Sequence, residues 1–366
     1  PTLMPLAITA LYGFAALFGA VFGLIELRLL RRFLQHRTTI RSSWRAEGEA
    51  APARPDGAPT PSVTIQLPLF NERTSADRII RAAADQDYPR DRFDIQVLDD
   101  STDETTAIAQ RLVDEIRGEG IRIELIHRDH RTGYKAGALA EGLTRSEADF
   151  VAVFDADFAP EPHFLQRLLL EDFAFDDPSV AFVQARWAWG SDIDHGWLPA
   201  TLALLLDRHF RVQKPVRAFL GNVTTFNGSG GIWRRSAIEV AGGWTSDTLT
   251  EDLDLSYRCA LAGMRGHYLP DVRVLNELPG HMRAFKLQQR RWAKGSAQCL
   301  RKLTSRVMRA GDLVESKWDE AFMLAGYAIH PVLLLSLVLW PWAVVYVDRR
   351  VFWVLQGLMS LSIAAA

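Results

Sequence analysis

Two aspartates, Asp155 and Asp157, end the segment 150–157. Its first five residues are apolar and mostly β-forming, which is typical of a strand buried on both faces of a parallel sheet. Because strand side chains alternate between faces, both carboxylates are expected on one side, at the edge where open α/β sheets bind ligands. Converging carboxylates suit Mg²⁺ or Mn²⁺, which take further ligands from phosphates. A solvated turn is the alternative for so short a motif.

Polar groups follow other predicted elements as well. Asp99 and Asp100 close a second strand. They could accept hydrogen bonds from a nucleobase or a ribose, although such residues also cap helices. Lys135 lies in a glycine-flanked turn that opens a helix, where lysine and the helix N-terminus both favour phosphate. Alternatively, Lys135 is an ordinary solvated side chain. In the glycine-rich loop 226–231 the backbone can approach a ligand closely.

Two helical motifs lie further along the chain. Thr250 is a plausible helix N-cap, and the helix start is expected to keep Asp252 ionised at neutral pH, as a general base must be. Gln288, Arg291 and Trp292 are spaced to share one face of a later helix. That face could bind pyrophosphate through the forked Arg291 and stack a sugar ring on Trp292. Anchoring beside a membrane is the alternative for this pair.

Composition narrows the class of protein. The chain has 366 residues and a formal net charge of −2, which gives no reason to expect a nucleic-acid partner. Cys259 and Cys299 are far apart and lack metal-ligand spacing, so they are interpreted as ordinary reduced thiols. No Gly-x-Gly-x-x-Gly or Walker loop follows the first predicted strand, which disfavours dinucleotide oxidoreductases and P-loop enzymes.

The middle of the chain alternates apolar strands with helical stretches. This alternation predicts an α/β fold, with a mostly parallel sheet covered by helices on both faces. The predicted strands are 63–69, 94–99, 121–127, 150–155 and 180–187, and the predicted helices are 74–86, 104–117, 134–145 and 162–173.

Long apolar segments at both ends predict an integral membrane protein. Residues 1–25 carry no charged side chain, and arginines follow them, so the positive-inside rule places the downstream domain in the cytoplasm. A cleaved signal peptide is disfavoured because its basic residues would precede the apolar run. A basic amphipathic stretch after Trp292 suits a membrane surface, with a helix packed on the domain as the alternative. The predicted organisation is a transmembrane helix at 1–27, a basic juxtamembrane segment and linker at 28–61, a cytoplasmic catalytic domain at 62–299, an amphipathic interfacial helix at 300–320, a transmembrane helix at 321–347, and part of a third at 351–366 that is expected to continue beyond the last residue.

The motifs, taken in order, resemble those of the membrane-integrated family-2 inverting glycosyltransferases, the cellulose-synthase-like group. Flanking residues such as Gln96-Val-Leu-Asp-Asp-Ser-Thr-Asp103 and Asn276-Glu-Leu-Pro279 look closest to glucomannan mannosyltransferases and xyloglucan-backbone glucan synthases. The resemblance covers about residues 63–302. It implies a GT-A type, Rossmann-like nucleotide-diphospho-sugar transferase fold flanked by transmembrane helices, in the plasma or inner membrane.

The resemblance also implies a role for each motif. Asp252 would be the catalytic base of a single inverting displacement that gives a β-linkage. Asp157, with Asp155, would hold Mg²⁺ or Mn²⁺. The nucleotide sugar would contact Asp99, Asp100, Lys135, Asp155, Gln288 and Arg291, and the acceptor would contact Trp292 and Glu251.

Several functions remain open from sequence. The resemblance favours transfer of a hexose from UDP-glucose or GDP-mannose to a growing β-linked, 1,4-type polysaccharide. A single transfer to a lipid acceptor such as ceramide or diacylglycerol would use much the same residues. A catalytically dead membrane scaffold is disfavoured, because fold stability does not require Asp100, Asp155, Asp157 and Asp252 together. No cyclic-di-nucleotide-binding domain is recognised.

Overall fold

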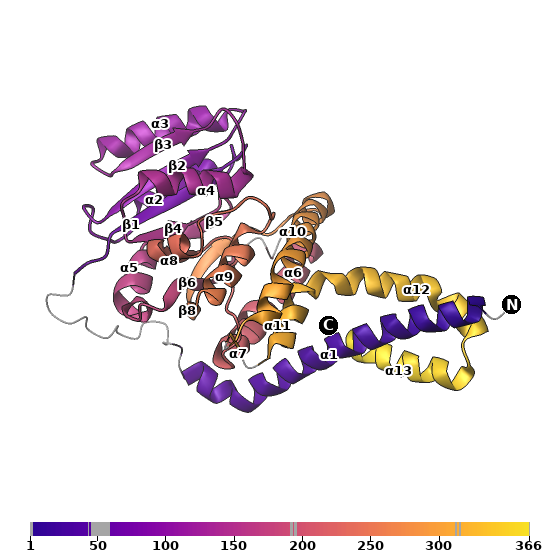
Figure 1. The fold of residues 1–366 in the computed structure, drawn as a ribbon. Coiled ribbons are helices and arrows are strands. Elements are labelled where there is room, and N and C mark those ends of the chain that lie inside the picture. Colours follow the sequence, from indigo (N-terminus) through magenta and orange to yellow (C-terminus); the bar gives the residue numbers. More distant parts are fainter. Residues whose placement is uncertain are drawn as a thin grey trace.

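An α/β domain is joined to a long helical arm (Figure 1). The arm comprises α1 (Leu3–Ser42), α12 (Ile329–Tyr346) and α13 (Arg349–Ala365). The computed structural model describes residues 3–42, 44, 59–190, 193, 196–311, 313–314 and 316–365. Most of the predicted linker, residues 45–58, lies outside the described residues.

The domain is built on one eight-stranded sheet with strand order β3-β2-β1-β4-β7-β6-β8-β5. Four neighbouring pairs are parallel (β2–β3, β1–β2, β1–β4 and β6–β8) and three are antiparallel (β4–β7, β6–β7 and β5–β8). The strands are β1 (Val63–Leu69), β2 (Phe93–Asp99), β3 (Ile123–His127), β4 (Phe150–Val153), β5 (Phe158–Pro160), β6 (Val180–Trp189), β7 (Gly231–Arg234) and β8 (Arg265–Asn276).

All five strands predicted from the sequence are present, and the prediction missed β5, β7 and β8. β5 has three residues and β7 four, which is too short for a periodic signal. β8 mixes polar residues such as Arg265 and Asp271 into its pattern. The three missed strands make every antiparallel pairing, so the sheet is mixed.

Helices cover both faces of the sheet, as predicted. α2 (Ala76–Ala84) and α3 (Thr105–Gly118) pack their apolar faces into the larger core cluster, together with residues of β1 and β2. α4 (Tyr134–Arg145) and α8 (Arg235–Val240) pack into a second cluster with Val151 and Val153 of β4. The helix predicted at 162–173 is a short α5 (Phe164–Gln166) that continues as a π-helix.

The remaining helices of the domain lie on the side from which the arm leaves (Figure 1). They are α6 (Trp197–Arg208), α7 (Lys214–Phe219), α9 (Glu251–Leu261), α10 (Met282–Arg309) and α11 (Lys317–Leu324). α10 runs without a break through residue 300, where the interfacial helix was predicted to begin. Its residues Cys299, Leu303 and Val307 are buried against α9 and α11. This part of the predicted interfacial helix therefore packs on the domain, which was the alternative left open.

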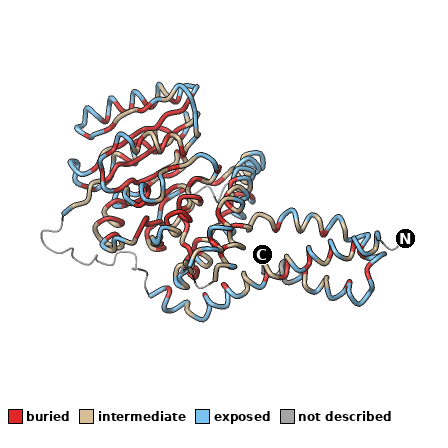
Figure 2. Tube along the Cα trace, in the orientation of Figure 1, coloured by how far each residue is buried: buried red, intermediate tan, exposed pale blue. Residues whose placement is uncertain are grey.

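The arm has the length and composition of membrane-spanning helices. α1 and the segment Gly326–Tyr346 are both long and apolar enough to cross a bilayer. α1 continues through the arginine-rich stretch to Ser42, whereas the helix predicted from sequence ended at residue 27. Large apolar side chains such as Leu6, Leu17 and Leu337 are exposed along the arm, and Figure 2 shows that the arm is far less buried than the sheet. These features indicate membrane association.

Candidate active site

The functional residues gather where β1, β2 and β4 end. β4 stops at Val153, so Asp155 and Asp157 lie in the turn between β4 and β5 and not within the strand. The backbone N–H of Asp155 donates to Ser229 Oγ at 2.9 Å, which joins this turn to the glycine-rich loop 226–231. The sequence prediction of carboxylates at the carboxyl edge of the sheet is confirmed.

Lys135 lies at the centre of the site. Its Nζ atom is 2.5 Å from Asp155 Oδ1 and 3.6 Å from Glu251 Oε1, and it donates to the Gly228 carbonyl oxygen at 2.9 Å. Burial opposes the charge of this lysine, but the carboxylates of Asp155 and Glu251 outweigh it and raise the pKa of Lys135 above its ordinary value. A permanent positive charge therefore faces the place where a diphosphate would be expected.

Gly228 lies between the side chains of Lys135, Asp155 and Asp252. Its φ of +75° is in the left-handed region that favours glycine. A Cβ atom at this position would be 3.7 Å from both Lys135 Nζ and Asp252 Oδ2, and 3.9 Å from Asp155 Oδ2. Three side chains from separate parts of the chain therefore converge on one glycine, and a side chain there would occupy the space between them.

Asp157 follows the end of β4, and its carboxylate is partly buried. Burial and, after it, the nearby Asp155 carboxylate raise the pKa of Asp157 to about 7. Burial and Asp155 also raise the pKa of Glu72, which follows β1. Lys135 is already paired with Asp155, so it offsets only part of this negative charge. Crowded carboxylates of this kind are an environment in which a bound cation stabilises the charged form.

These carboxylates fit a divalent metal that shares its ligands with a substrate. In the part of the chain that the structure describes, no three His, Cys, Asp or Glu side chains are placed to hold an ion by themselves. Asp157 and Asp155 supply hard oxygen ligands, and Mg²⁺ or Mn²⁺ commonly completes its coordination with phosphate oxygens and water.

Asp252 is the second residue of α9. Burial and the neighbouring Glu251 carboxylate raise the pKa of Asp252 to about 7. The helix start was expected to keep this group ionised at neutral pH, whereas burial and like charge move its titration toward neutral pH. A carboxylate that titrates near neutral pH is well matched to general-base catalysis.

Asp99 and Asp100 make bonds within the protein. Asp99 is fully buried, and its carboxylate contacts His127 Nδ1 and the Thr106 hydroxyl, each at 2.7 Å. Asp100 forms a two-point ion pair with Arg128, with both N–O distances at 2.6 Å. Of the two carboxylates, Asp100 lies nearer to solvent, so it is better placed to meet a nucleoside.

α10 carries Gln288, Arg291 and Trp292 over the site. Trp292 is partly buried against the main core cluster, whereas Arg291 is exposed. The charge of Arg291 acts on both Glu72 and Arg131, so this guanidinium lies near the ends of β1 and β3. Gln288 is partly buried. The structure thus brings the last sequence motif close to the first ones.

The same face of α10 also fixes residues 248–252. Gln298 Oε1 accepts from the Leu249 N–H at 2.9 Å, and Cys299 Sγ lies 3.4 Å from Thr250 Oγ1. Gly295 permits this approach, because a Cβ atom there would be 2.5 Å from Thr250 Cγ2 and 2.9 Å from its backbone nitrogen. The glycine therefore sets the distance between α10 and the start of α9.

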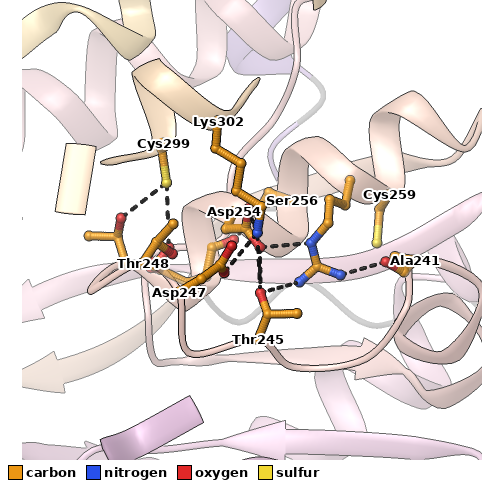
Figure 3. A network of polar contacts seen from close by, with 12 residues as sticks. Ala241, Thr245, Asp247, Thr248, Asp254, Ser256, Cys259, Cys299 and Lys302 are labelled. Atoms are coloured by element: carbon orange, nitrogen blue, oxygen red, sulfur yellow. Dashed lines mark hydrogen bonds and ion pairs between the residues drawn. The ribbon is translucent and has the colours of Figure 1, made fainter. Parts of the chain in front are cut away.

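A buried ion network also joins α9 to α10 (Figure 3). Asp254 is fully buried and pairs with Arg258 Nε at 2.7 Å and with Lys302 Nζ at 2.8 Å. It also accepts from the Thr245 hydroxyl at 2.9 Å, and Lys302 reaches Asp247 at 2.8 Å. Since each buried charge has a partner, the network anchors the base-bearing helix to α10.

Sequence reasoning missed several residues of this site. Glu72 follows β1 on the ligand side of the sheet, and the rule that picked out Asp155 would have found it. Arg131 precedes Lys135 by four residues, and its guanidinium lies over the Phe70 ring, 3.3 Å from the centroid. The sequence around Asp254 shows only that it is the third acidic residue in the first turn of a helix, which does not predict its buried ion network.

The fold and site together define a GT-A-like glycosyltransferase. The family model described as "Glycosyltransferase like family 2" matches residues 60–295, and the chain belongs to that family.

Among curated proteins the chain is similar to glucomannan 4-beta-mannosyltransferases. It is 44% identical over 255 residues to glucomannan 4-beta-mannosyltransferase 2 of Arabidopsis thaliana, covering 68% of this chain and 47% of that protein. It is 40% identical over 253 residues to glucomannan 4-beta-mannosyltransferase 1 of Oryza sativa subsp. japonica, covering 68% of this chain and 48% of that protein. The chain thus spans about half the length of the relatives it matches.

A solved structure supports the fold over the whole chain. The mannosyltransferase PcManGT from Pyrobaculum calidifontis, in complex with GDP-Man and Mn²⁺, superposes with a TM-score of 0.64 at 20% identity. The match covers 99% of this chain and 96% of that one, so the helical arm is part of the similarity.

Proposed function

We propose that this chain is a membrane-bound, inverting glycosyltransferase that moves mannosyl units from GDP-mannose to a growing β-1,4-linked polysaccharide. The observation that carries the chemistry is the convergence of Lys135, Asp155 and Asp252 around Gly228. Mannose is favoured over glucose because the similar plant proteins are named as mannosyltransferases and the structural neighbour is a complex with GDP-Man.

Asp252 is the base of the proposed reaction. Its carboxylate takes the proton from an acceptor hydroxyl while that oxygen attacks the anomeric carbon. The bond from this carbon to the diphosphate breaks in the same displacement, so an α-linked donor yields a β-linked product. Trp292 and Glu251 border the acceptor. Because the pKa of Asp252 is about 7, much of the base is already deprotonated at neutral pH.

The donor is held by charges on the other side of Gly228. Lys135 and Arg291 neutralise the diphosphate, and Gln288 lies on the same helix face as Arg291. Asp100 and the deeper Asp99 shape the nucleoside end. Asp157 and Asp155 would hold Mg²⁺ or Mn²⁺, which supplies positive charge for the departing diphosphate when bound.

The arm sets the proposed location. α1 and the segment Gly326–Tyr346 would cross the membrane. The arginines that follow the apolar part of α1 support a cytoplasmic position for the catalytic domain, where nucleotide sugars would reach it.

Donor and acceptor are tested together. The purified chain is given radiolabelled GDP-mannose or UDP-glucose with Mn²⁺ or Mg²⁺, and products are digested with linkage-specific glycanases. We expect a product many residues long, made from GDP-mannose and cleaved by an endo-β-1,4-mannanase. A glucanase-sensitive polymer from UDP-glucose would contradict the donor assignment. A lipid carrying one sugar would replace the polymer acceptor with a lipid acceptor.

A further inference from the structure

A fully buried carboxylate, Glu320, lies beside the place where the arm contacts the domain. It lies on α11, the short helix that precedes Gly326–Tyr346. Its oxygens pair with Arg217 at 2.8 Å and accept from the Tyr257 hydroxyl at 2.7 Å. They also accept from the Asn222 amide at 2.9 Å and the Val223 N–H at 3.2 Å. One side chain thus binds four groups from three segments of the domain.

Three of these four donors lie in segments that lead to the two walls of the proposed active site, which are α9 and the loop 226–231. Tyr257 is on α9, whose first turn carries Asp252. Asn222 and Val223 begin the segment that leads into the loop 226–231 and Gly228. A second bond joins the walls to each other, because the Phe226 N–H donates to Ser256 Oγ at 2.8 Å. A shift of Glu320 would therefore move the base and the glycine loop together.

α11 is also tied to the first helix of the arm. Asp319, the neighbour of Glu320, pairs with Arg28 of α1 at 3.1 Å. Two residues earlier on α1, Glu26 accepts from Arg208 at 2.7 Å and from Gln213 at 2.6 Å. Adjacent residues of α11 therefore hold α1 on one side and the active-site walls on the other.

We infer that Glu320 is a positioning residue that couples the placement of the arm helices to the placement of Asp252. The inference rests on the proposed function, since it takes Asp252 as the base. Burial of a charge with this many donors is costly unless its geometry is fixed, so the carboxylate holds its neighbours in one arrangement. The conformation of the membrane helices would thereby affect the chemical step and not donor capture.

The test removes one link and leaves the ion pair intact. Glu320→Gln would leave the buried Arg217 without its counter-charge and so risks misfolding. Tyr257→Phe deletes only the hydroxyl that ties α9 to Glu320. Tyr268→Phe is the matched control, because this buried hydroxyl also makes one hydrogen bond, to the Phe210 carbonyl at 2.7 Å, and its donor–acceptor pair lies outside the proposed catalytic residues.

Both variants are assayed in the full chain with whichever hexosyl donor the wild type uses. We expect Tyr257→Phe to lower kcat about tenfold with unchanged donor KM, since a misplacement of about 1 Å can cost up to about 100-fold in rate. The melting temperatures of the two variants should fall by similar amounts. Tyr268→Phe, however, should keep the wild-type kcat.

Equal kcat values in the two variants, or a raised donor KM in Tyr257→Phe, would overturn the positioning role while leaving the proposed function intact. A wild-type chain inactive with both GDP-mannose and UDP-glucose would overturn the proposed function and the inference with it.

Discussion

Replacing Gly295 with alanine tests how closely α10 must approach the start of α9. The new Cβ atom would lie 2.5 Å from Thr250 Cγ2, which is about 0.9 Å short of the 3.4 Å at which ordinary contact begins. Two further Thr250 atoms, Oγ1 and the backbone nitrogen, lie within 3 Å of the same point, so side-chain rotation alone cannot relieve the clash. α10 and residues 250–252 must therefore separate by nearly 1 Å.

The expected loss of activity follows from that displacement. Moving the base by about 1 Å relative to Arg291 and Trp292 can reduce turnover by up to about 100-fold. Stability should change less, because overpacking costs about 1–3 kcal/mol while alanine in a helix regains up to about 1 kcal/mol over glycine. Turnover with saturating labelled donor and thermal melting measure the two effects.

The control is Gly118→Ala at the end of α3, where a Cβ atom would meet nothing within 4 Å. It should melt at or above the wild-type temperature and keep full turnover. If Gly295→Ala also kept full turnover, the contact between α10 and Thr250 would not set the catalytic geometry, and the reasoning would be refuted.

Three further predictions follow from the same site. Asp157→Asn should abolish measurable Mn²⁺ binding by calorimetry in the presence of GDP, whereas retained affinity would move the metal elsewhere. Asp252→Asn should lower turnover roughly 10²–10⁴-fold with donor affinity nearly unchanged, and wild-type kcat should fall about tenfold per pH unit as pH drops below about 7, because the base must be deprotonated. In inside-out vesicles, added protease should digest the catalytic domain, and protection of that domain would reverse the proposed orientation.

The parts of the structure that sequence predicted are those with local signals. β4 is a continuous apolar run, and its burial on both faces follows from that run alone. The helix from Tyr134 to Arg145 was predicted with the same bounds. Asp155 and Asp157 were placed at the correct edge of the sheet, because the ends of parallel strands share one edge.

The parts that sequence could not predict depend on contacts between distant residues. Asp99 meets His127 only because β2 and β3 are paired in register. The closeness of Gly295 to Thr250 has no effect on the local hydrophobic periodicity. From the sequence alone, a glycine inside a helix only weakens the prediction of a helix. The pKa of Asp252 is raised to about 7 by the burial of Asp252 and by the nearby Glu251 carboxylate. The sequence pattern of a helix start predicts neither the burial nor the closeness of the two carboxylates.

These contacts divide the residues of the proposed site into two groups. Asp155 follows β4 and Lys135 is in the first turn of α4, and the ion pair between them forms the proposed donor side. Asp252 is held by α10 through the face that also carries Arg291 and Trp292, so the base and the acceptor floor move as one unit. Gly228 lies at the junction of the two groups, and its loop is bonded to both, through Lys135 on one side and Ser256 on the other. If the product elongates as proposed, the opening that admits it is expected at this loop, where the proposed donor side and base side meet.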